Sequence, residues 1–227
     1  MVMHPVRLLL TIDWHGTSFP ARVSRQLAAI AVVAACLVLP GCVDDAGAGS
    51  NSDIPQSADS PAAVVLASDI PIAHTPPGGY GSEFPQPVLT TCTEPLVAEA
   101  PDLRGMWKTE SAVRYGQPVL PDDAIYQHFQ RIEQCGDRLV VTAGGVIHDM
   151  RCDGTEANGV HDVLESDFTT QITVVATYEA GVHVLRPVGI PVEVTRRLDG
   201  SKLAWSYLGL EVTLVRIGGP DAPPPVN

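Results

Sequence analysis

The run HDMRCD at residues 148–153, with His161 shortly after it, is the densest group of side chains that could do chemistry. His148, Cys152 and His161 offer two imidazoles and a thiolate, which are ligands that zinc accepts. Their separations of four and nine residues match no familiar zinc pattern, and Asp-Gly and Asn-Gly turns lie between them. We favour the simpler interpretation, in which His148 alternates on a strand and Asp153 shapes the loop that follows. No metal and no cofactor is expected.

Two other catalytic patterns can be considered. Cys152 and a histidine have the atoms of a nucleophilic pair, but in an oxidising compartment we expect this cysteine to be bonded or buried. Glu165 and Asp167 share a strand face by parity, which a solvated face explains better than acid–base catalysis. The sequence contains no G-x-S-x-G, H-E-x-x-H, Walker or G-x-G-x-x-G motif. We therefore predict that the protein is not an enzyme.

A different chemistry is indicated by LVLPGC, which ends at Cys42. The apolar core before it, residues 27–39, is 13 residues long and follows Arg22 and Arg25. A membrane-spanning helix needs roughly 20 apolar residues, so this stretch is typical of the core of a secretory signal. The last four residues resemble a bacterial lipobox, which implies cleavage after Gly41 and acylation of Cys42 by palmitate or a similar chain. A plain signal peptide or an uncleaved anchor is the alternative.

This resemblance implies a lipoprotein on the extracytoplasmic face of a bacterial cell membrane. Residues 1–41 would be its signal peptide, and the long stretch before it suggests an over-long gene model with a true start near Val23. Removing residues 1–41 takes away three arginines and one aspartate, which leaves 11 basic and 25 acidic residues and a net charge of −14. Such a balance argues against nucleic-acid binding and against charge-driven docking on anionic lipid. Attachment to the membrane would therefore come from Cys42.

Residues 42–100 differ in composition from the rest of the chain. From residue 43 to 100 there are eight acidic residues, eight prolines and no Lys or Arg. Proline removes backbone donors and like charges repel, so the sequence predicts an extended, disordered tether. The alternative is that VVLASDIPI, residues 64–72, packs on the domain as a strand.

Residues 101–218 predict an all-β domain. Short runs rich in Val, Ile, Thr, Tyr and Trp alternate with Gly and Asp-Gly turns, which is typical of strands and hairpins. In QITVVATY, for example, Ile172 and Val174 share one face. One short helix is expected near residues 121–123, and residues 219–227 form a Pro-rich tail. About eight to ten strands would expose two edges unless they close, so we predict a single up-and-down antiparallel β-barrel, monomeric in solution.

Two ends of this domain resemble a known family. LRGMW, ending at Trp107, contains the G-x-W that opens the first strand of lipocalins and related calycins. The last strand, residues 210–217, carries Arg216, and residues 193–217 are similar to the last strands of fatty-acid-binding proteins. The resemblance implies that Arg216 packs across Trp107 and closes the barrel base. The alternative is ordinary core packing for the tryptophan and a surface position for the arginine.

The five cysteines predict one disulfide. Cys36 would leave with the signal and Cys42 would be acylated, so Cys92, Cys135 and Cys152 remain. In the predicted barrel one strand separates those of the last two, which places them about 9.6 Å apart, beyond the roughly 7 Å limit of a disulfide. Cys92 precedes the first strand, which lies beside the strand that ends at Cys135. We therefore favour Cys92–Cys135, with Cys135–Cys152 as the alternative.

The barrel interior is the remaining candidate site. His128, Arg186 and Arg196 could supply a polar group if they point inward, and an apolar cavity with few polar groups is the usual form of a small-ligand site. The apolar side chains that could face the interior are Phe129, Ile132, Val141, Ile147, Val174, Tyr178, Val184, Leu203, Trp205 and Tyr207. We predict that the barrel binds or carries a small apolar or amphipathic ligand. The alternative is a barrel without a cavity that acts as an interaction or structural module of the envelope.

Overall fold

The computed structural model describes residues 63–225 of the chain. The predicted signal peptide, the lipid-attachment residue Cys42 and the first part of the predicted tether lie outside the described residues. Within the described range, no helix is long and apolar enough to cross a membrane.

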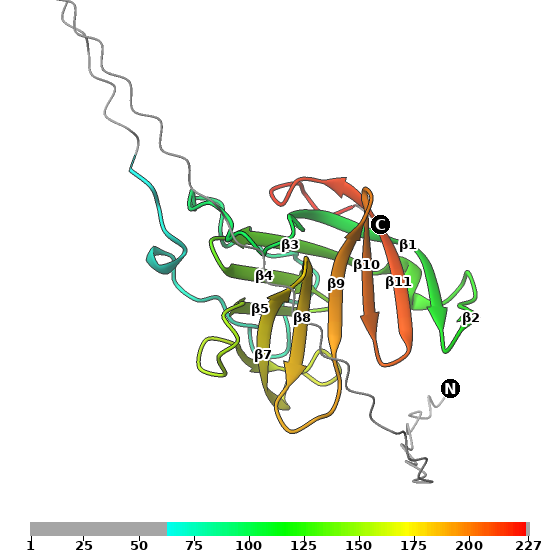
Figure 1. Cartoon of the computed structure of the whole chain (residues 1–227). Helices are drawn as coiled ribbons and strands as arrows, with labels where there is room; N and C mark the ends of the chain where they lie inside the picture. Colours follow the sequence, from blue (N-terminus) through cyan, green and yellow to red (C-terminus); the bar gives the residue numbers. More distant parts are fainter. Residues whose placement is uncertain (1–62, 226–227) are drawn as a thin grey trace, which may run out of the picture. The chain divides into compact units, whose positions relative to one another are not determined.

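The described residues form one antiparallel sheet that curls into a nearly closed barrel (Figure 1). Its strands are β1 (Gly105–Arg114), β2 (Gln117–Pro118), β3 (Phe129–Cys135), β4 (Arg138–Ala143), β5 (Val146–Arg151), β6 (Val160–Val163), β7 (Gln171–Glu179), β8 (Val182–Pro187), β9 (Val194–Asp199), β10 (Lys202–Tyr207) and β11 (Leu210–Gly218). The hydrogen-bonded order is β5-β4-β3-β1-β11-β10-β9-β8-β7-β6, and the short β2 pairs with β1 beside this circuit. The predicted all-β, up-and-down barrel is confirmed.

The barrel is incompletely closed between β5 and β6. These two strands share no hydrogen-bonded ladder. The Arg151 amide donates to the Asn158 carbonyl over 2.8 Å, and a ring nitrogen of His148 lies 3.1 Å from the Val163 carbonyl oxygen. Single hydrogen bonds therefore span this seam, whereas continuous ladders join the other neighbours in the circuit.

Alternation along the strands builds the interior core. Val174 and Ala176 on β7 belong to one buried cluster with Trp107 and Leu203, and Ile172 packs against it. Fully burying a valine, leucine or isoleucine side chain contributes about 1.5–3 kcal/mol. The Trp107 indole also donates to the Leu103 carbonyl over 2.8 Å, so its polar atom is satisfied inside the core. The period-two pattern therefore predicted the inward face of β7 correctly.

The short helix expected near residues 121–123 is a 3₁₀ turn, η2 (Ala124–Gln127). Asp123 caps it, because its carboxylate accepts a hydrogen bond of 2.9 Å from the Ile125 amide. Ile125 packs against the interior core. The turn thereby covers part of the barrel between β2 and β3.

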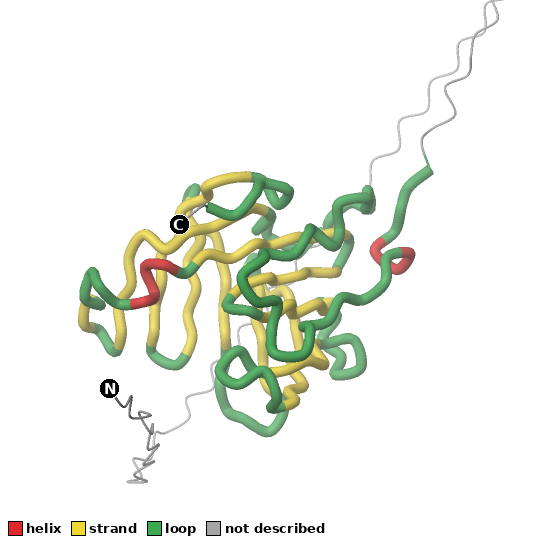
Figure 2. The backbone as a smooth tube through the Cα atoms, turned by 180° about the vertical axis from the view of Figure 1, so that it is seen from behind, coloured by secondary structure: helices red, strands yellow, loops and turns green. Residues whose placement is uncertain are grey.

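Residues 63–100 correct the predicted tether. This segment, which we call the strap, crosses the outer face of β3, β4 and β5 (Figures 1 and 2). It contains the 3₁₀ turn η1 (Ala67–Asp69) and is otherwise irregular, so it is also not the packed strand that was the alternative. Ala67 and Leu89 of the strap form a second buried cluster with Val140 and Ile147 on the sheet.

The strap packs because charged side chains of the sheet satisfy its backbone. The Leu89 amide donates to Glu133 over 2.7 Å, and the Ala73 amide donates to Asp149 over 2.8 Å. Arg131 donates to the Pro85 carbonyl over 2.7 Å. A Pro-rich segment lacks the donors for a strand ladder, but each buried backbone group still needs a partner. Here the outward-facing charges of β3 and β5 supply those partners.

A disulfide joins Cys92 of the strap to Cys135 at the end of β3, with 6.2 Å between the Cα atoms. This is the pairing that the sequence favoured over Cys135–Cys152. Cys152 is a free, buried thiol. At the first strand, the Arg216 guanidinium carbon lies 4.7 Å from the centre of the Trp107 ring, which is the contact that the lipocalin resemblance implied.

Candidate ligand-binding site

A cavity of about 500 Å³ lies inside the barrel, at the end where β8 finishes and β9 begins. Small-molecule sites are typically about 300–1,000 Å³, so this volume suits one small ligand. Most of its wall is apolar, and its lining residues are His148, Val160, Leu164, Glu165, Ser166, Ile172, Val174, Leu185, Pro187, Val194, Arg196, Trp205 and Tyr207. His148, Arg196 and Trp205 are the nitrogen-bearing side chains in this wall.

Arg196 on β9 places a guanidinium against this apolar wall. It is buried, with 7% of its surface exposed, and it takes part in none of the ion pairs found among residues 63–225. Its Nε donates to the Gln130 side-chain oxygen over 3.1 Å, while Nη1 has no hydrogen-bond partner. Burial lowers the pKa of Arg196 to about 10, so the group remains charged at neutral pH.

Other polar nitrogens without a partner surround this charge. The Gln130 side-chain nitrogen, the Trp205 indole nitrogen and both ring nitrogens of His183 make no hydrogen bond within the protein. The Arg196 guanidinium lies 5.8 Å from the centre of the Trp205 ring. Burying an unsatisfied donor costs about 1–3 kcal/mol, and a charged one more. The interior is therefore an incomplete polar site that favours an acceptor, above all an anionic one.

Three histidines extend this environment without adding charge. Burial, followed by repulsion from Arg196, lowers the pKa of His128 to about 4 and the pKa of His183 well below its usual value. The pKa of His148 is also lowered, chiefly by burial. His128 stacks on Trp205 with 5.1 Å between the ring centres. At neutral pH these imidazoles are neutral, and Arg196 carries the positive charge of the cavity wall.

Of the three polar groups proposed for the interior, the structure turns two inward. Arg196 and His128 lie inside the barrel, whereas Arg186 is outside and pairs with Glu179 and Glu193. The apolar candidates divide in the same way. Those in or against the interior cluster, or lining the cavity, are Ile132, Val141, Val174, Tyr178, Leu203, Trp205 and Tyr207.

Phe129, Ile147 and Val184 were predicted to face the interior, and for these three the prediction is wrong. Phe129 packs on Phe84 of the strap, with 5.3 Å between the rings, and Ile147 belongs to the cluster under the strap. Val184 has the opposite parity to Leu185, which lines the cavity. Side chains alternate along a strand, so Phe129 and Ile132 could not have shared a face.

The three candidate zinc ligands His148, Cys152 and His161 do not converge on one site, because His148 lines the cavity and His161 lines a different pocket. His148 reaches the seam carbonyl described above, whereas His161 is exposed and lies 2.8 Å from the Glu156 carbonyl oxygen. Burial raises the pKa of Cys152 to about 12, which keeps it a protonated thiol. A protonated thiol is a poor nucleophile and a poor metal ligand.

Glu165 and Asp167, the pair of carboxylates, have different surroundings. Glu165 lines the cavity, and burial raises its pKa. Asp167 is exposed, and hydrogen bonds from the Thr170 hydroxyl and from the amides of Thr170 and Thr169 lower its pKa to about 2. The Asp167 carboxylate therefore stabilises the turn at residues 167–170 by accepting hydrogen bonds from its backbone.

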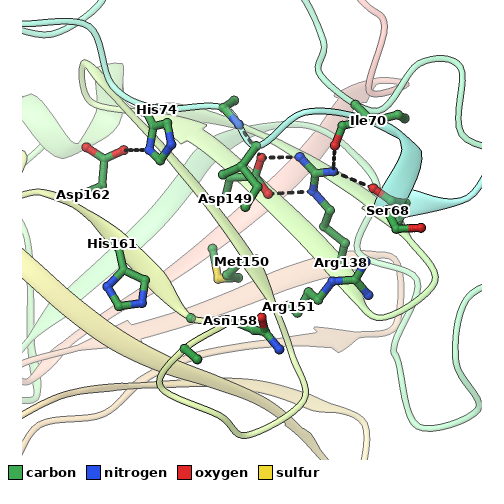
Figure 3. A pocket seen from close by; sticks show the side chains of 15 residues that line it. Ser68, Ile70, His74, Arg138, Asp149, Met150, Arg151, Asn158, His161 and Asp162 are labelled. Carbon is green, nitrogen blue, oxygen red and sulfur yellow. Dashed lines mark hydrogen bonds and ion pairs between the residues drawn. The ribbon is translucent and has the colours of Figure 1, made fainter.

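A second, smaller pocket of about 260 Å³ lies between the strap and the outer face of the sheet (Figure 3). Arg138 dominates it and is fully paired: it forms two hydrogen bonds to Asp149, of 2.8 and 2.6 Å, and donates to the carbonyls of Ala67, Ile70 and Pro71. Because the protein already satisfies this guanidinium, it has little left to offer a ligand. We therefore place the candidate ligand site inside the barrel.

Gln130 and His183 are interior residues that were not among the candidates predicted from the sequence. Gln130 has the parity of Ile132 on β3, and His183 has the parity of Leu185 on β8, so alternation carried the signal. Polar residues at core parity are unusual. A search for them on predicted strands would have found this part of the site.

No protein-family model matches the chain, and no curated protein matches it in sequence. Among solved structures, human cRBP IV is similar at 17% identity and a TM-score of 0.39, and the match covers 51% of this chain and 98% of that one. The zebrafish ileal bile acid-binding protein, solved with cholic acid, is similar at 21% identity and a TM-score of 0.38, with coverages of 50% and 98%. At these values the likeness concerns the barrel alone.

Proposed function

We propose that the barrel binds a small amphipathic anion, with the apolar part of the ligand in the cavity and its negative group at Arg196. The observation that carries this proposal is a buried guanidinium that faces a cavity of about 500 Å³ and has no carboxylate partner among the described residues. A buried charge without a counter-charge is costly to a folded protein. A ligand carboxylate, sulfate or phosphate would supply the missing counter-charge.

The cavity argues against the alternative of a filled barrel. Its wall combines an extended apolar surface with a few nitrogen donors, which matches the two halves of an amphipathic molecule. A wholly apolar ligand would leave Arg196 and Trp205 unsatisfied. An amphipathic acid satisfies both, so it is the ligand class that we favour within the broader class of small apolar or amphipathic molecules.

We further propose that the barrel is held at the extracytoplasmic face of a bacterial membrane by acylation of Cys42. The support is the lipobox LPGC behind a 13-residue apolar core and two arginines. Labelling with a palmitate analogue should mark the wild type and leave Cys42→Ala unmarked. Equal labelling of both proteins would contradict the anchor.

The ligand proposal is tested first by native mass spectrometry of the protein secreted from a bacterial host. We expect a defined adduct that dissociates on denaturation and carries an acidic group. A second measurement compares a fluorescent fatty acid with the alcohol of the same chain. The acid should bind more tightly to the wild type, and Arg196→Met should remove this preference.

Arg186→Met is the matched control, because Arg186 lies on the neighbouring strand β8 and points outward. It should leave the preference for the acid intact. Equal affinity for acid and alcohol in the wild type would contradict the proposed role of Arg196. A clean mass without adduct, together with no binding of either probe, would contradict ligand binding by the barrel.

A further inference from the structure

Six large apolar side chains are exposed on the turns at one end of the barrel, and we call them the collar. They belong to the segments after β1, after β8 and at the end of β10, and their exposed fractions range from 38% to 78%. The collar consists of Tyr115, Leu120, Val188, Ile190, Tyr207 and Leu208. Single exposed apolar residues are ordinary, but a gathered set marks an interaction surface.

Strand register places these turns at the same end. The last residue of β1, Arg114, pairs with Leu210 at the start of β11, and Leu210 pairs with Tyr207 at the end of β10. Tyr207 in turn pairs with Val194 at the start of β9. Val194 and Tyr207 also line the cavity. The collar therefore borders the mouth of the proposed ligand site.

The backbone of two collar residues is unusual for their type. Tyr115 and Leu208 have φ values of 50° and 47°, and each precedes a glycine with positive φ. Two-residue turns of this kind favour Asn-Gly or Asp-Gly, because Asn and Asp tolerate the left-handed conformation. The chain instead presents a large apolar side chain at each tip. Turn formation alone does not account for these residue types.

The two tips are held together as one surface. The Tyr115 amide donates to the Gly209 carbonyl over 2.8 Å. The Tyr115 ring lies directly over Gly209, where any side chain would collide with it. The β1–β2 and β10–β11 turns therefore present their apolar tips in a fixed relation.

The charges around the collar offer no free cation. Arg114 pairs with Asp123 over 3.3 Å, and Arg186 pairs with Glu193 over 2.7 Å. Asp122, in the same segment as Leu120, takes part in none of the ion pairs among residues 63–225. An anionic surface would therefore be repelled, whereas a neutral or zwitterionic apolar interface would not.

We propose that the collar inserts into the surface of a zwitterionic lipid bilayer and so places the cavity mouth at the lipid interface. This proposal rests on the proposed function, because it uses the anchor at Cys42 and the ligand cavity. Residues 43–62 number 20 between the anchor and the described domain, and 20 extended residues span at most about 70 Å. The anchored barrel can therefore touch its own membrane. Protruding turn tips also suit insertion into lipid better than they suit holding a peptide.

The test uses the full chain reconstituted in phosphatidylcholine vesicles that contain brominated lipid. Leu120→Trp places a reporter in the collar, and Ile217→Trp places one at an exposed site near the end of β11 that is remote from the collar. The parent emission is subtracted, because both variants of the anchored protein keep the native Trp107 and Trp205. We expect severalfold stronger bromine quenching of the collar reporter. Anionic lipid should weaken this quenching.

A second variant tests the tips themselves. Tyr115→Asn combined with Leu208→Asn suits the left-handed backbone at both positions, so the fold should be kept while the apolar tips are lost. Quenching of the Leu120→Trp reporter should then fall to the level of the remote reporter. Ala180→Asn is the matched control, because Ala180 has φ 49° before Gly181 in the β7–β8 turn at the opposite end. It should leave quenching unchanged.

Three outcomes would overturn the bilayer contact. The first is the absence of quenching at the collar reporter while a fluorescent fatty acid still binds. The second is equal quenching of both reporters, which would indicate unspecific adsorption. The third is concentration-dependent self-association that the double Asn variant abolishes, which would make a second copy the occupant. Loss of fatty-acid binding with retained quenching would contradict the ligand proposal alone.

Discussion

Three arginines are buried in this small domain, and the surroundings of two of them, Arg138 and Arg196, differ completely. Arg138, between the outer face of the sheet and the strap, meets both oxygens of Asp149 and three strap carbonyls. Arg196, on the inner face of the barrel, donates to one amide oxygen, that of Gln130, and its Nη1 has no partner.

This difference separates a structural charge from a binding charge. The environment of Arg138 is complete without any other molecule, so its role is to hold the strap on the sheet. The environment of Arg196 lacks a carboxylate and leaves Nη1 without a partner, so its role is explained by something that enters the cavity. Burial alone would have grouped the two residues together. Their hydrogen-bond partners distinguish them.

Removing the structural arginine should have the largest effect on stability. Arg138→Met leaves Asp149 as a buried charge without a partner and orphans three carbonyls of the strap, so we expect a loss of about 5 kcal/mol of unfolding free energy. Urea unfolding measures it. Arg114→Met, which breaks the more exposed pair with Asp123, should cost at most about 1 kcal/mol. Similar costs for both variants would contradict the role of Arg138.

The disulfide should contribute slightly less. Replacing Cys92 and Cys135 by serine removes a link across 43 residues, which corresponds to about 4 kcal/mol in the loop-entropy description. The strap should also become more sensitive to proteases than the barrel, because it loses its covalent attachment to the sheet. A strap that is cut no faster in the variant would show that Arg138 and its neighbours hold it unaided.

The sequence predicted the barrel far better than it predicted the strap. Alternation and glycine turns are local signals, and they were sufficient for the strand circuit and for the inward face of β7. The strap carries the composition of a disordered segment, but its order comes from partners distant in sequence. The Leu89 amide meets Glu133 and the Ala67 carbonyl meets Arg138, across 44 and 71 residues. No pattern within residues 63–100 reveals those contacts.

The candidate site shows the same limit. Arg196 could be proposed as an inward polar group from its place on a strand, but so could Arg186, which lies outside. Their difference depends on which parity faces the interior in β8 and β9, and charged residues obscure that parity. The missing partner of Arg196 is a property of the assembled barrel. The missing partner could not be predicted without knowing how β3 and β9 lie relative to each other.

Acid should weaken the barrel through its buried histidines. His128 has a pKa of about 4 in the folded protein against 6.5 when unperturbed, so the unfolded chain takes up a proton first as the pH falls. Stability therefore decreases from about pH 6.5 towards about pH 4, and His128 contributes about 2 kcal/mol of this loss between about pH 7 and pH 5. His128→Phe, which keeps a ring against Trp205, should flatten the pH dependence by that amount. An unchanged slope of unfolding free energy against pH would mean that the His128 imidazole is solvated in the folded protein and has an ordinary pKa.

Removing the binding arginine should change stability least. Arg196→Met exchanges a buried charge without a counter-ion for an apolar side chain of similar length, so we expect the free energy of unfolding to stay the same or to rise by about 1 kcal/mol. Affinity for an anionic probe should nevertheless fall, by about tenfold or more if the hydrogen bonds to the charged group are worth roughly 1.5–3 kcal/mol. Urea unfolding and probe titration on the same preparation measure both quantities. A loss of stability as large as that of Arg138→Met would mean that the protein itself satisfies Arg196, and the distinction between the two arginines would fail. Stability retained with affinity lost is the combination that only a binding charge explains.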